Sequence, residues 1–213
     1  MSCAAFKLRF GVIGTNFVSD WLLEGAAEDP RFEVAAIYSR LQDTANAFAE
    51  KHNIPHTFIS LEKMASSPLI DAVYIASPTA LHSEQAILFM EHGKHVLCEK
   101  PSASNVRELG RMIEAAKKYD VVFMEAMKST LMPGFKAVLQ HLPEIGTVRR
   151  YFASYCQYSS RYDKLKAGEV MNAFKPELSN GAVMDLGIYT IYPLVVLWGR
   201  PLGISATGTL LST

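Results

Sequence analysis

The stretch HVLCEKP, from His95 to Pro101, decides how the rest of the chain is interpreted. Its apolar residues suit a short buried strand, which is followed at once by Glu99, Lys100 and a proline. Such strands are common in parallel sheets, and ligands of open α/β sheets bind beyond the carboxyl ends of the strands. The stretch therefore places Lys100 where it could touch a ligand. Taken alone, a surface lysine after a strand is the more ordinary interpretation.

Composition narrows the class of protein. Of the 213 residues, 49% are hydrophobic and 20% are charged, which is typical of a globular protein with a sizeable core. Lys+Arg and Asp+Glu both number 21, so the zero net charge predicts neither a nucleic-acid partner nor a membrane surface. No run approaches the roughly 18 apolar residues of a membrane-spanning helix, and the N-terminus does not read as a signal peptide.

The cysteines point to a reducing compartment. Cys3, Cys98 and Cys156 are odd in number and far apart, with no CxxC motif. This pattern argues against a disulfide framework and against a structural zinc site. We therefore expect a cytoplasmic protein without a bound metal.

Strands and helices are expected to alternate over the first part of the chain. The expected strands are residues 7–13, 32–38, 56–59, 70–76, 95–98 and 121–124, with helical patterns between them. This alternation predicts an α/β fold with a doubly wound parallel sheet. We expect residues 1–125 to form that domain.

A glycine-containing turn follows the first expected strand. Gly14, Asn16 and Ser19 stand where a dinucleotide-binding turn carries G-x-G-x-x-G/A. Asn is the non-glycine residue best suited to a left-handed backbone, and Ser is small enough for close packing of helix and strand. The next helix would add its N-terminal partial charge for a phosphate. An ordinary strand-to-helix turn remains an open alternative.

The end of the second expected strand bears on the choice of cofactor. An NAD site usually places an acidic residue there, whereas this chain has Ser39 and Arg40. A hydroxyl and a guanidinium suit a 2′-phosphate, so NADP(H) is favoured over NAD(H). Alternatively, Arg40 is a solvated residue that opens the next helix.

The pattern changes over residues 126–213, which we expect to begin a second domain. A helix is expected at 132–142, a long strand at 147–158, an apolar helix at 181–198 and a strand at 204–213. Asp185 and Tyr189 are four residues apart on the apolar helix and would share a face. They could form a structural pair or serve chemistry.

Four motifs together carry a resemblance: GVIGTNFVSDWL, IASPTALHSEQA, HVLCEKP and NGAVMDLGIYTI. In this order they resemble the glucose–fructose oxidoreductase/inositol dehydrogenase (Gfo/Idh/MocA) family, most closely its dihydrodiol dehydrogenase-like members. The resemblance implies an N-terminal Rossmann domain that binds NAD(P). It also implies a C-terminal α+β domain with an open mixed or antiparallel sheet, which often forms a dimer face. Members usually continue further, so the second domain is expected to be truncated or the sequence to be a fragment.

Site residues are carried over from the same motifs. Lys100 would touch the reacting hydroxyl or carbonyl, Asp185 would be the substrate-side acid, and Tyr189 would take the position of the catalytic Tyr or His. The Lys100–Pro101 bond is expected to be cis. The cofactor-binding residues expected from the motifs and strand ends are Gly14, Thr15, Asn16, Phe17, Val18, Ser39, Arg40, Ser77, Pro78, Thr79, Leu81, His82, Glu99, Lys100, Pro101 and Lys128.

These expectations define one leading function and its rivals. The leading hypothesis is an NADP(H)-dependent oxidoreductase that transfers a hydride between nicotinamide and a small sugar, polyol or diol, as a homodimer or larger homo-oligomer. The alternative is a non-catalytic NAD(P)-binding regulator of the same family. A methyltransferase is disfavoured, because its second strand usually ends in an acidic residue rather than Ser39 and Arg40.

Overall fold

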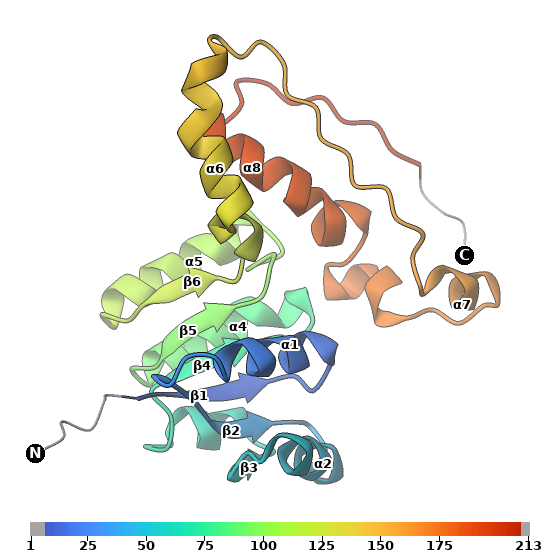
Figure 1. The fold of residues 1–213 in the computed structure, drawn as a ribbon. Helices are drawn as coiled ribbons and strands as arrows, with labels where there is room; N and C mark the ends of the chain where they lie inside the picture. Colours follow the sequence, from blue (N-terminus) through green and yellow to red (C-terminus); the bar gives the residue numbers. More distant parts are fainter. Residues whose placement is uncertain (1–6, 210–213) are drawn as a thin grey trace, which may run out of the picture. The chain divides into compact units, whose positions relative to one another are not determined.

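A computed structural model of the chain describes residues 7–209 (Figure 1). The contacts between Cα atoms divide the chain into two compact units, Met1–Ala126 and Met127–Thr213. Cys3 and the last residues of the strand expected at 204–213 lie outside the described residues. The first unit is an α/β layer structure, and the second is built from helices and irregular segments.

The first unit contains a six-stranded parallel sheet with the order β3-β2-β1-β4-β5-β6 (Figure 1). Successive strands extend the sheet outward from β1 on one side and from β4 on the other, so the doubly wound sheet expected from the sequence is confirmed. The strands are β1 (Leu8–Ile13), β2 (Phe32–Tyr38), β3 (His56–Phe58), β4 (Ala72–Ile75), β5 (His95–Cys98) and β6 (Phe123–Glu125). The helices are α1 (Phe17–Ala26), α2 (Gln42–His52), α3 (Leu61–Ala65), α4 (Thr79–Glu91) and α5 (Val106–Lys118).

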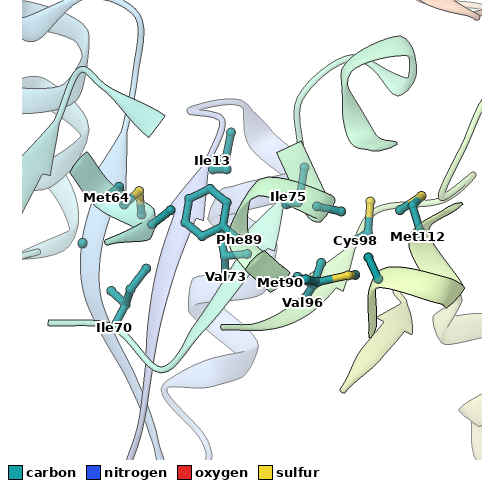
Figure 2. Close-up of a cluster of buried hydrophobic side chains, with 14 of the residues drawn as sticks. Ile13, Met64, Ile70, Val73, Ile75, Phe89, Met90, Val96, Cys98 and Met112 are labelled. Carbon is teal, nitrogen blue, oxygen red and sulfur yellow. The ribbon is translucent and has the colours of Figure 1, made fainter. Parts of the chain in front are cut away.

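Two hydrophobic clusters cover the two faces of this sheet. Along β4, Val73 and Ile75 face a cluster that includes Phe89 of α4 and Met112 of α5 (Figure 2). Residues of β4 that alternate with these two face the other cluster, which includes Phe48 of α2. A strand covered by helices on both faces has no solvent-facing side, which explains why β4 is apolar throughout.

Polar anchors fix the amino ends of the central strands. The Arg9 guanidinium donates to both carboxylate oxygens of Asp71, at 2.9 and 2.7 Å. The Lys94 ammonium donates to the carbonyl oxygens of Ser67 and Ile70, each at 2.8 Å. These bonds join the entries to β1, β4 and β5 at the edge of the sheet opposite to the expected ligand edge.

The second unit differs from the sequence expectation. Its helical elements are η1 (Lys128–Leu131), α6 (Pro133–His141), η2 (Leu142–Ile145), α7 (Tyr162–Lys166), η3 (Asn172–Phe174), η4 (Pro176–Leu178), a π-helical segment η5 (Val183–Gly187) and α8 (Ile188–Trp198). The strand expected at 147–158 is absent from the structure, and no strand lies at 204–209. Within residues 127–209 neither segment has a strand to pair with, and an unpaired strand cannot satisfy its backbone hydrogen-bonding groups.

Aromatic contacts, rather than a sheet, hold the segment around residue 151 to the apolar helix. Tyr151 donates from its hydroxyl to the carbonyl oxygen of Thr190 at 3.0 Å, and its ring meets Trp198 edge-on at 5.4 Å. The aromatic residues that suggested a strand therefore pack against α8.

The stretch Pro176–Trp198 is long and apolar enough to span a membrane by length and composition, with a mean hydropathy of 1.5. An apolar helix was expected at 181–198, but not one that meets the criterion for a membrane span. None of this stretch is buried within the chain. Core helices of globular proteins meet the same criterion, so the stretch by itself assigns no membrane location.

Candidate functional site

The expected site residues of the first unit gather at one edge of its sheet. The strand register sets Ile13 beside Tyr38 on one side and beside Ile75 on the other, and Ile75 beside Cys98. The segments that follow these four strands therefore start side by side at the carboxyl edge. This is the edge at which open α/β sheets bind ligands.

The turn after β1 is built around Gly14, whose φ of +109° is open to glycine but strained for other residues. A Cβ at this position would lie 2.7 Å from the carbonyl oxygen of Ala76, at the end of β4. Ser19 is buried and donates from its hydroxyl to the Gly14 carbonyl oxygen at 2.8 Å, which fixes the first turn of α1 against the strand end. The close packing expected of Ser19 is thus observed.

Asn16 has a different role from the one expected. Its φ of −96° is not left-handed, so the explanation by a left-handed backbone is wrong. Asn16 is the N-cap of α1, where its side-chain oxygen accepts a hydrogen bond from the Val18 N–H at 2.9 Å. Its side-chain nitrogen lies 3.5 Å from the Ala76 carbonyl oxygen. Asn16 thus starts the helix and contacts the neighbouring strand end.

The turn after β1 also contains Thr15, Phe17 and Val18. Phe17 is 49% exposed and meets Trp21 edge-on, with the ring centroids 5.0 Å apart. Thr15 lines a hollow of about 490 Å³ together with residues of α2, among them Thr44 and Phe48. Of the residues lining that hollow, Thr15 is the only expected site residue, so the hollow is distinct from the turn that bears Lys100.

After β2 the chain offers Ser39 and Arg40 at the same edge. The backbone N–H of Ser39 donates to the Phe58 carbonyl oxygen at 3.1 Å, which fixes the strand end, while Arg40 is exposed. Leu41 is the N-cap of α2 and supplies no side-chain hydrogen bond to its first turn. The first N–H groups of a helix lack intrahelical partners and favour an anion. Asp43 in that turn works in the opposite direction.

After β4, the segment Ser77-Pro78-Thr79 leads into α4. The Ser77 hydroxyl donates to the side-chain oxygen of Gln85, which lies in α4, at 2.7 Å. Leu81 is 40% exposed, whereas Thr79 is 6% exposed and His82 is 1% exposed. His82 therefore lies under the loop rather than on its surface.

The Glu99-Lys100-Pro101 turn after β5 is held by several independent contacts. Glu99 accepts a hydrogen bond from the Tyr74 hydroxyl at 2.7 Å and another from the Lys100 backbone N–H at 3.1 Å. Its own backbone N–H donates to the Ile75 carbonyl oxygen at 2.8 Å. The Lys100–Pro101 peptide bond is cis, as expected. These contacts fix the backbone from which the Lys100 side chain projects.

Two further contacts close the turn. The Ser102 N–H donates to the carboxylate of Glu125, at the end of β6, at 2.9 Å. The Pro101 carbonyl oxygen lies 3.0 Å from Nδ1 of His82. Neighbouring strands on both sides of β5 therefore hold the same turn.

Two buried groups beneath the turn, Tyr74 and Cys98, have raised pKa values and stay uncharged. Burial, followed by the negative charge of Glu99, raises the pKa of the Tyr74 phenol. Burial also raises the pKa of the Cys98 thiol, with smaller contributions from Glu99 and Glu125. Tyr74 therefore acts as a neutral hydrogen-bond donor, and Cys98 as an inert core residue.

Asp185, Tyr189 and Lys128 belong to the second unit. Asp185 lies in the π-helical segment η5, whose turns are wider than those of an α-helix, and Tyr189 lies in α8. The Tyr189 ring stacks on Tyr155 with centroids 5.6 Å apart. Both residues are half-buried, and Lys128 starts η1. Among residues 7–209, no cluster of three or more His, Cys, Asp or Glu side chains is suited to a metal ion.

Sequence reasoning did not anticipate the residues that support the site. Tyr74, Gln85 and Glu125 each hydrogen-bond to a segment at the carboxyl edge. Tyr74 could have been suspected from the sequence, since it is the residue with a polar tip in the otherwise aliphatic strand AVYI. Glu125 offers a weaker indication, as an acidic residue at the end of an apolar strand.

The chain matches the model of a known protein family. Residues 8–127 match the Gfo/Idh/MocA family, described as an oxidoreductase family with an NAD-binding Rossmann fold. The chain is 59% identical over 206 residues to scyllo-inositol 2-dehydrogenase (NADP(+)) of Bacillus subtilis (strain 168), covering 97% of this chain and 63% of that protein. It is 34% identical over 212 residues to trans-1,2-dihydrobenzene-1,2-diol dehydrogenase of Danio rerio, covering 97% of this chain and 61% of that one.

Solved structures agree with the fold. A 3-ketoreductase from Actinomadura kijaniata, in complex with TDP-benzene and NADP, superposes with a TM-score of 0.71 at 25% identity, over 91% of this chain and 56% of that one. An oxidoreductase from Desulfitobacterium hafniense matches with a TM-score of 0.73 at 17% identity, over 91% and 56% of the two chains, which supports the fold alone. The chain thus spans less than two thirds of the length of these proteins.

Proposed function

The chain belongs to the Gfo/Idh/MocA family of oxidoreductases with an NAD-binding Rossmann fold, and from this premise we propose that it transfers a hydride between NADP(H) and a small polyol, sugar or diol. The observation that carries the proposal is the Glu99-Lys100-Pro101 turn. Contacts from β4, β6 and α4 fix this turn at the carboxyl edge of the sheet. Because the backbone of Lys100 is fixed at the ligand edge, its ammonium can present a positive charge to a bound substrate.

The residues at this edge fit a dinucleotide. Gly14 lets the turn after β1 pack directly against the backbone that follows β4, which sets the position of the start of α1. The first turn of α1 directs backbone N–H groups and the positive end of the helix toward that turn, which suits a pyrophosphate. When bound, the nicotinamide supplies or accepts the hydride.

Lys100 is proposed to act on the substrate oxygen. Its ammonium would stabilise negative charge developing on that oxygen as the carbon gains or loses hydride. This stabilisation requires that the ammonium be in place before the reaction, because a side chain that must reorganise loses part of the benefit. The hydrogen bonds to Glu99 supply that preorganisation for the backbone of the turn.

Tyr189 is proposed as the general acid or base and Asp185 as the acid that binds a substrate hydroxyl or orients Lys100. A nearby ammonium favours the phenolate form of a tyrosine, which would bring its proton transfer toward working pH. The proposal therefore requires the second unit to present Tyr189 to the substrate held at Lys100. Lys128 is proposed to line the same site.

NADP(H) is the proposed cofactor because of the end of β2. Arg40 is exposed beside the first turn of α2, where the N-cap Leu41 makes no side-chain hydrogen bond. A 2′-phosphate would meet a guanidinium, the Ser39 hydroxyl and helix N–H groups there. The name of the Bacillus subtilis relative includes NADP(+), which supports this choice.

The names of the relatives support the proposed class of substrate. One acts on scyllo-inositol and another on a dihydrodiol, by their names. Both compounds carry vicinal hydroxyl groups, so we propose a substrate with a secondary hydroxyl flanked by another. A homodimer or larger homo-oligomer in the cytoplasm completes the proposal.

Turnover by two variants tests the proposed roles. We expect Lys100→Met and Tyr189→Phe each to lower kcat by about tenfold or more with little change in NADPH affinity, because each removes an interaction made at the reacting oxygen. Lys117→Met on α5 and Tyr192→Phe on α8 are the matched controls and should keep wild-type rates. NADPH binding without turnover on a panel of inositols, sugars and diols would refute the oxidoreductase and favour a regulator.

Cofactor preference is tested by thermal shift with NADPH and NADH. NADPH should raise Tm more than NADH at equal concentration, since ligand stabilisation grows with the ratio of concentration to Kd. Arg40→Ala should remove most of that difference. A larger shift with NADH in the wild-type chain would overturn the choice of NADP(H).

A further inference from the structure

His82 is a buried imidazole that spans two of the loops at the ligand edge. Its Nε2 lies 2.8 Å from the carbonyl oxygen of Ser77, after β4. Its Nδ1 lies 3.0 Å from the carbonyl oxygen of Pro101, after β5. With 1% of its surface exposed, His82 cannot offer a nitrogen to a bound cofactor without breaking these contacts. The direct cofactor contact expected of His82 therefore does not fit the geometry.

Both contacts require a proton on the ring nitrogen that makes them. Carbonyl oxygens only accept hydrogen bonds, so each nitrogen must carry a proton to make its bond. A neutral imidazole has one N–H and can serve either Ser77 or Pro101, leaving a lone pair facing the other oxygen. The imidazolium serves both.

Opposing effects act on that second proton. Burial lowers the pKa of His82 below its ordinary value of 6.5, while the backbones of Ser77, Pro101 and Ser102 favour the charged ring. Glu99 is the charged group whose field acts on the ring, and it also favours the charge. On the other elements packed here, Arg111 of α5 lies 3.4 Å from the hydroxyl of Ser83, and Glu125 of β6 is bonded to Ser102.

Building on the proposed function, we infer that His82 is a positioning residue that ties the Ser77-Pro78-Thr79 loop to the Lys100-Pro101 turn, and that it holds both only when each ring nitrogen carries a proton. The neutral ring holds one loop and lets the other relax. The two loops are therefore held together when the ring is protonated and can move separately when it is neutral.

The sign of the pH effect follows from the same contacts. Hydrogen bonds to the two carbonyl oxygens raise the pKa of His82. The pKa is therefore higher when the ring holds both loops than when the buried ring has lost one of them. A falling pH consequently favours the state in which His82 holds both loops. Global stability moves in the opposite direction. Because the folded pKa lies below the unfolded value, protonation of His82 costs folding free energy as the pH falls below 6.5.

NADPH affinity measured against pH tests the inference. His82→Gln keeps an N–H donor that does not titrate. The ratio of its Kd to the wild-type Kd should rise by about threefold between about pH 7.5 and about pH 5.5, the factor expected for one hydrogen bond. His92→Gln is the matched control, since His92 is the C-cap of the same helix, is exposed, and has its Nδ1 2.9 Å from the Leu88 carbonyl oxygen. A ratio that stays constant, or falls along with wild-type stability, overturns the inference.

A second measurement needs neither variant nor cofactor. In the wild-type chain labelled with ¹⁵N, we expect the His82 ring to become doubly protonated at the acid end of that range. Amide signals of Ser77 and Thr79 and those of Lys100 and Ser102 should shift with the same midpoint. A single neutral tautomer throughout, or shifts confined to one loop, would contradict the inference. Failure of NADPH to bind would refute the proposed function. The NMR measurement would still test the role of His82, because it needs no cofactor.

Discussion

Apolar residues make up a similar share of the two units, but the two units bury them to different extents. Within residues 7–209, the fully buried apolar side chains lie in the first unit, apart from Met127 at the boundary. In the second unit, large apolar residues such as Ile191, Val195 and Trp198 of α8 are exposed. The difference is in hydrogen bonding as well. Each strand of the first unit has a neighbour, whereas the segment 147–158 has none among the described residues. Among the described residues, apolar side chains form a core where helices pack on the sheet and remain exposed along α8.

The two described cysteines offer the sharpest test of this contrast. Cys98 is buried in the sheet core, and burial raises the pKa of its thiol; Cys156 is exposed in the second unit. Since the thiolate is the reactive form, Cys156 should be alkylated faster than Cys98 by a factor of about 10³ or more. Peptide mapping by mass spectrometry after timed exposure to iodoacetamide measures both rates. Comparable rates would mean that the core around β5 opens readily.

Glycine substitutions compare a required glycine with a tolerant one. Gly14→Val should destabilise the first unit by about 3 kcal/mol or more and abolish NADPH binding, because the side chain would meet the Ala76 carbonyl oxygen at a positive φ. Gly110→Ala on α5 has open space around it and should stabilise the chain by up to about 1 kcal/mol. Urea unfolding followed by circular dichroism measures both changes. Equal effects would show that the turn is not as tight as described.

Removal of one hydroxyl tests the support of the Glu99 turn. Tyr74→Phe should cost about 1 to 3 kcal/mol of stability, because the partly buried carboxylate of Glu99 loses a hydrogen-bond donor. It should also lower turnover, if the position of Lys100 depends on that contact. Tyr119→Phe removes an exposed hydroxyl bonded to Lys118 and should have no measurable effect. A neutral outcome for Tyr74→Phe would assign the position of the turn to its other contacts.

An acid titration compares ion pairs of the two units. The Arg9 guanidinium lowers the pKa of Asp71 below its ordinary value of 3.8. The pair therefore contributes stability above that value, and the contribution is lost as the pH falls through the folded pKa. Asp71→Asn should cost about 1 kcal/mol near pH 7 after allowance for solvent screening, with the difference from wild type vanishing at acid pH.

The control for this titration is Asp163→Asn, which removes the exposed partner of Lys166 in the second unit. We expect no measurable loss of stability at any pH from this control, since exposed pairs are screened. A loss as large as that of Asp71→Asn would remove the distinction between the two units.

Local patterns predicted the first unit well because short apolar strand patterns and helical patterns alternate clearly along its sequence. The strand at Phe32–Tyr38 coincides with its expected range, and the turn after it brings Ser39 to the ligand edge. The register that aligns four strand ends could not be predicted, since it depends on pairing between distant segments. For the same reason the support of Glu99 by Tyr74, 25 residues away, was not visible in the sequence.

The failures of prediction have physical causes as well. Asn16 was expected to adopt a left-handed backbone because Asn tolerates one, but capping α1 satisfies an N–H group without that strain. Residues 147–158 have the composition of a strand, yet composition cannot supply a neighbour. Tyr151 and Tyr155 instead contact side chains of α8. His82 was expected to bind the cofactor, and its burial in α4 could not be predicted because it depends on three-dimensional packing.

The polar anchors at the amino edge of the sheet have a consequence for how this chain can change. Arg9, Asp71 and Lys94 join the starts of three strands, and none of them lies near the carboxyl edge. These anchors and the residues proposed to choose the cofactor, Ser39 and Arg40, therefore lie at opposite ends of the strands. Mutations that alter ligand preference at Ser39 or Arg40 can accumulate without drawing on the contacts that keep the sheet assembled. Such a division makes the fold evolvable, and it marks the carboxyl-edge loops as the region to diversify in a directed search for new substrates.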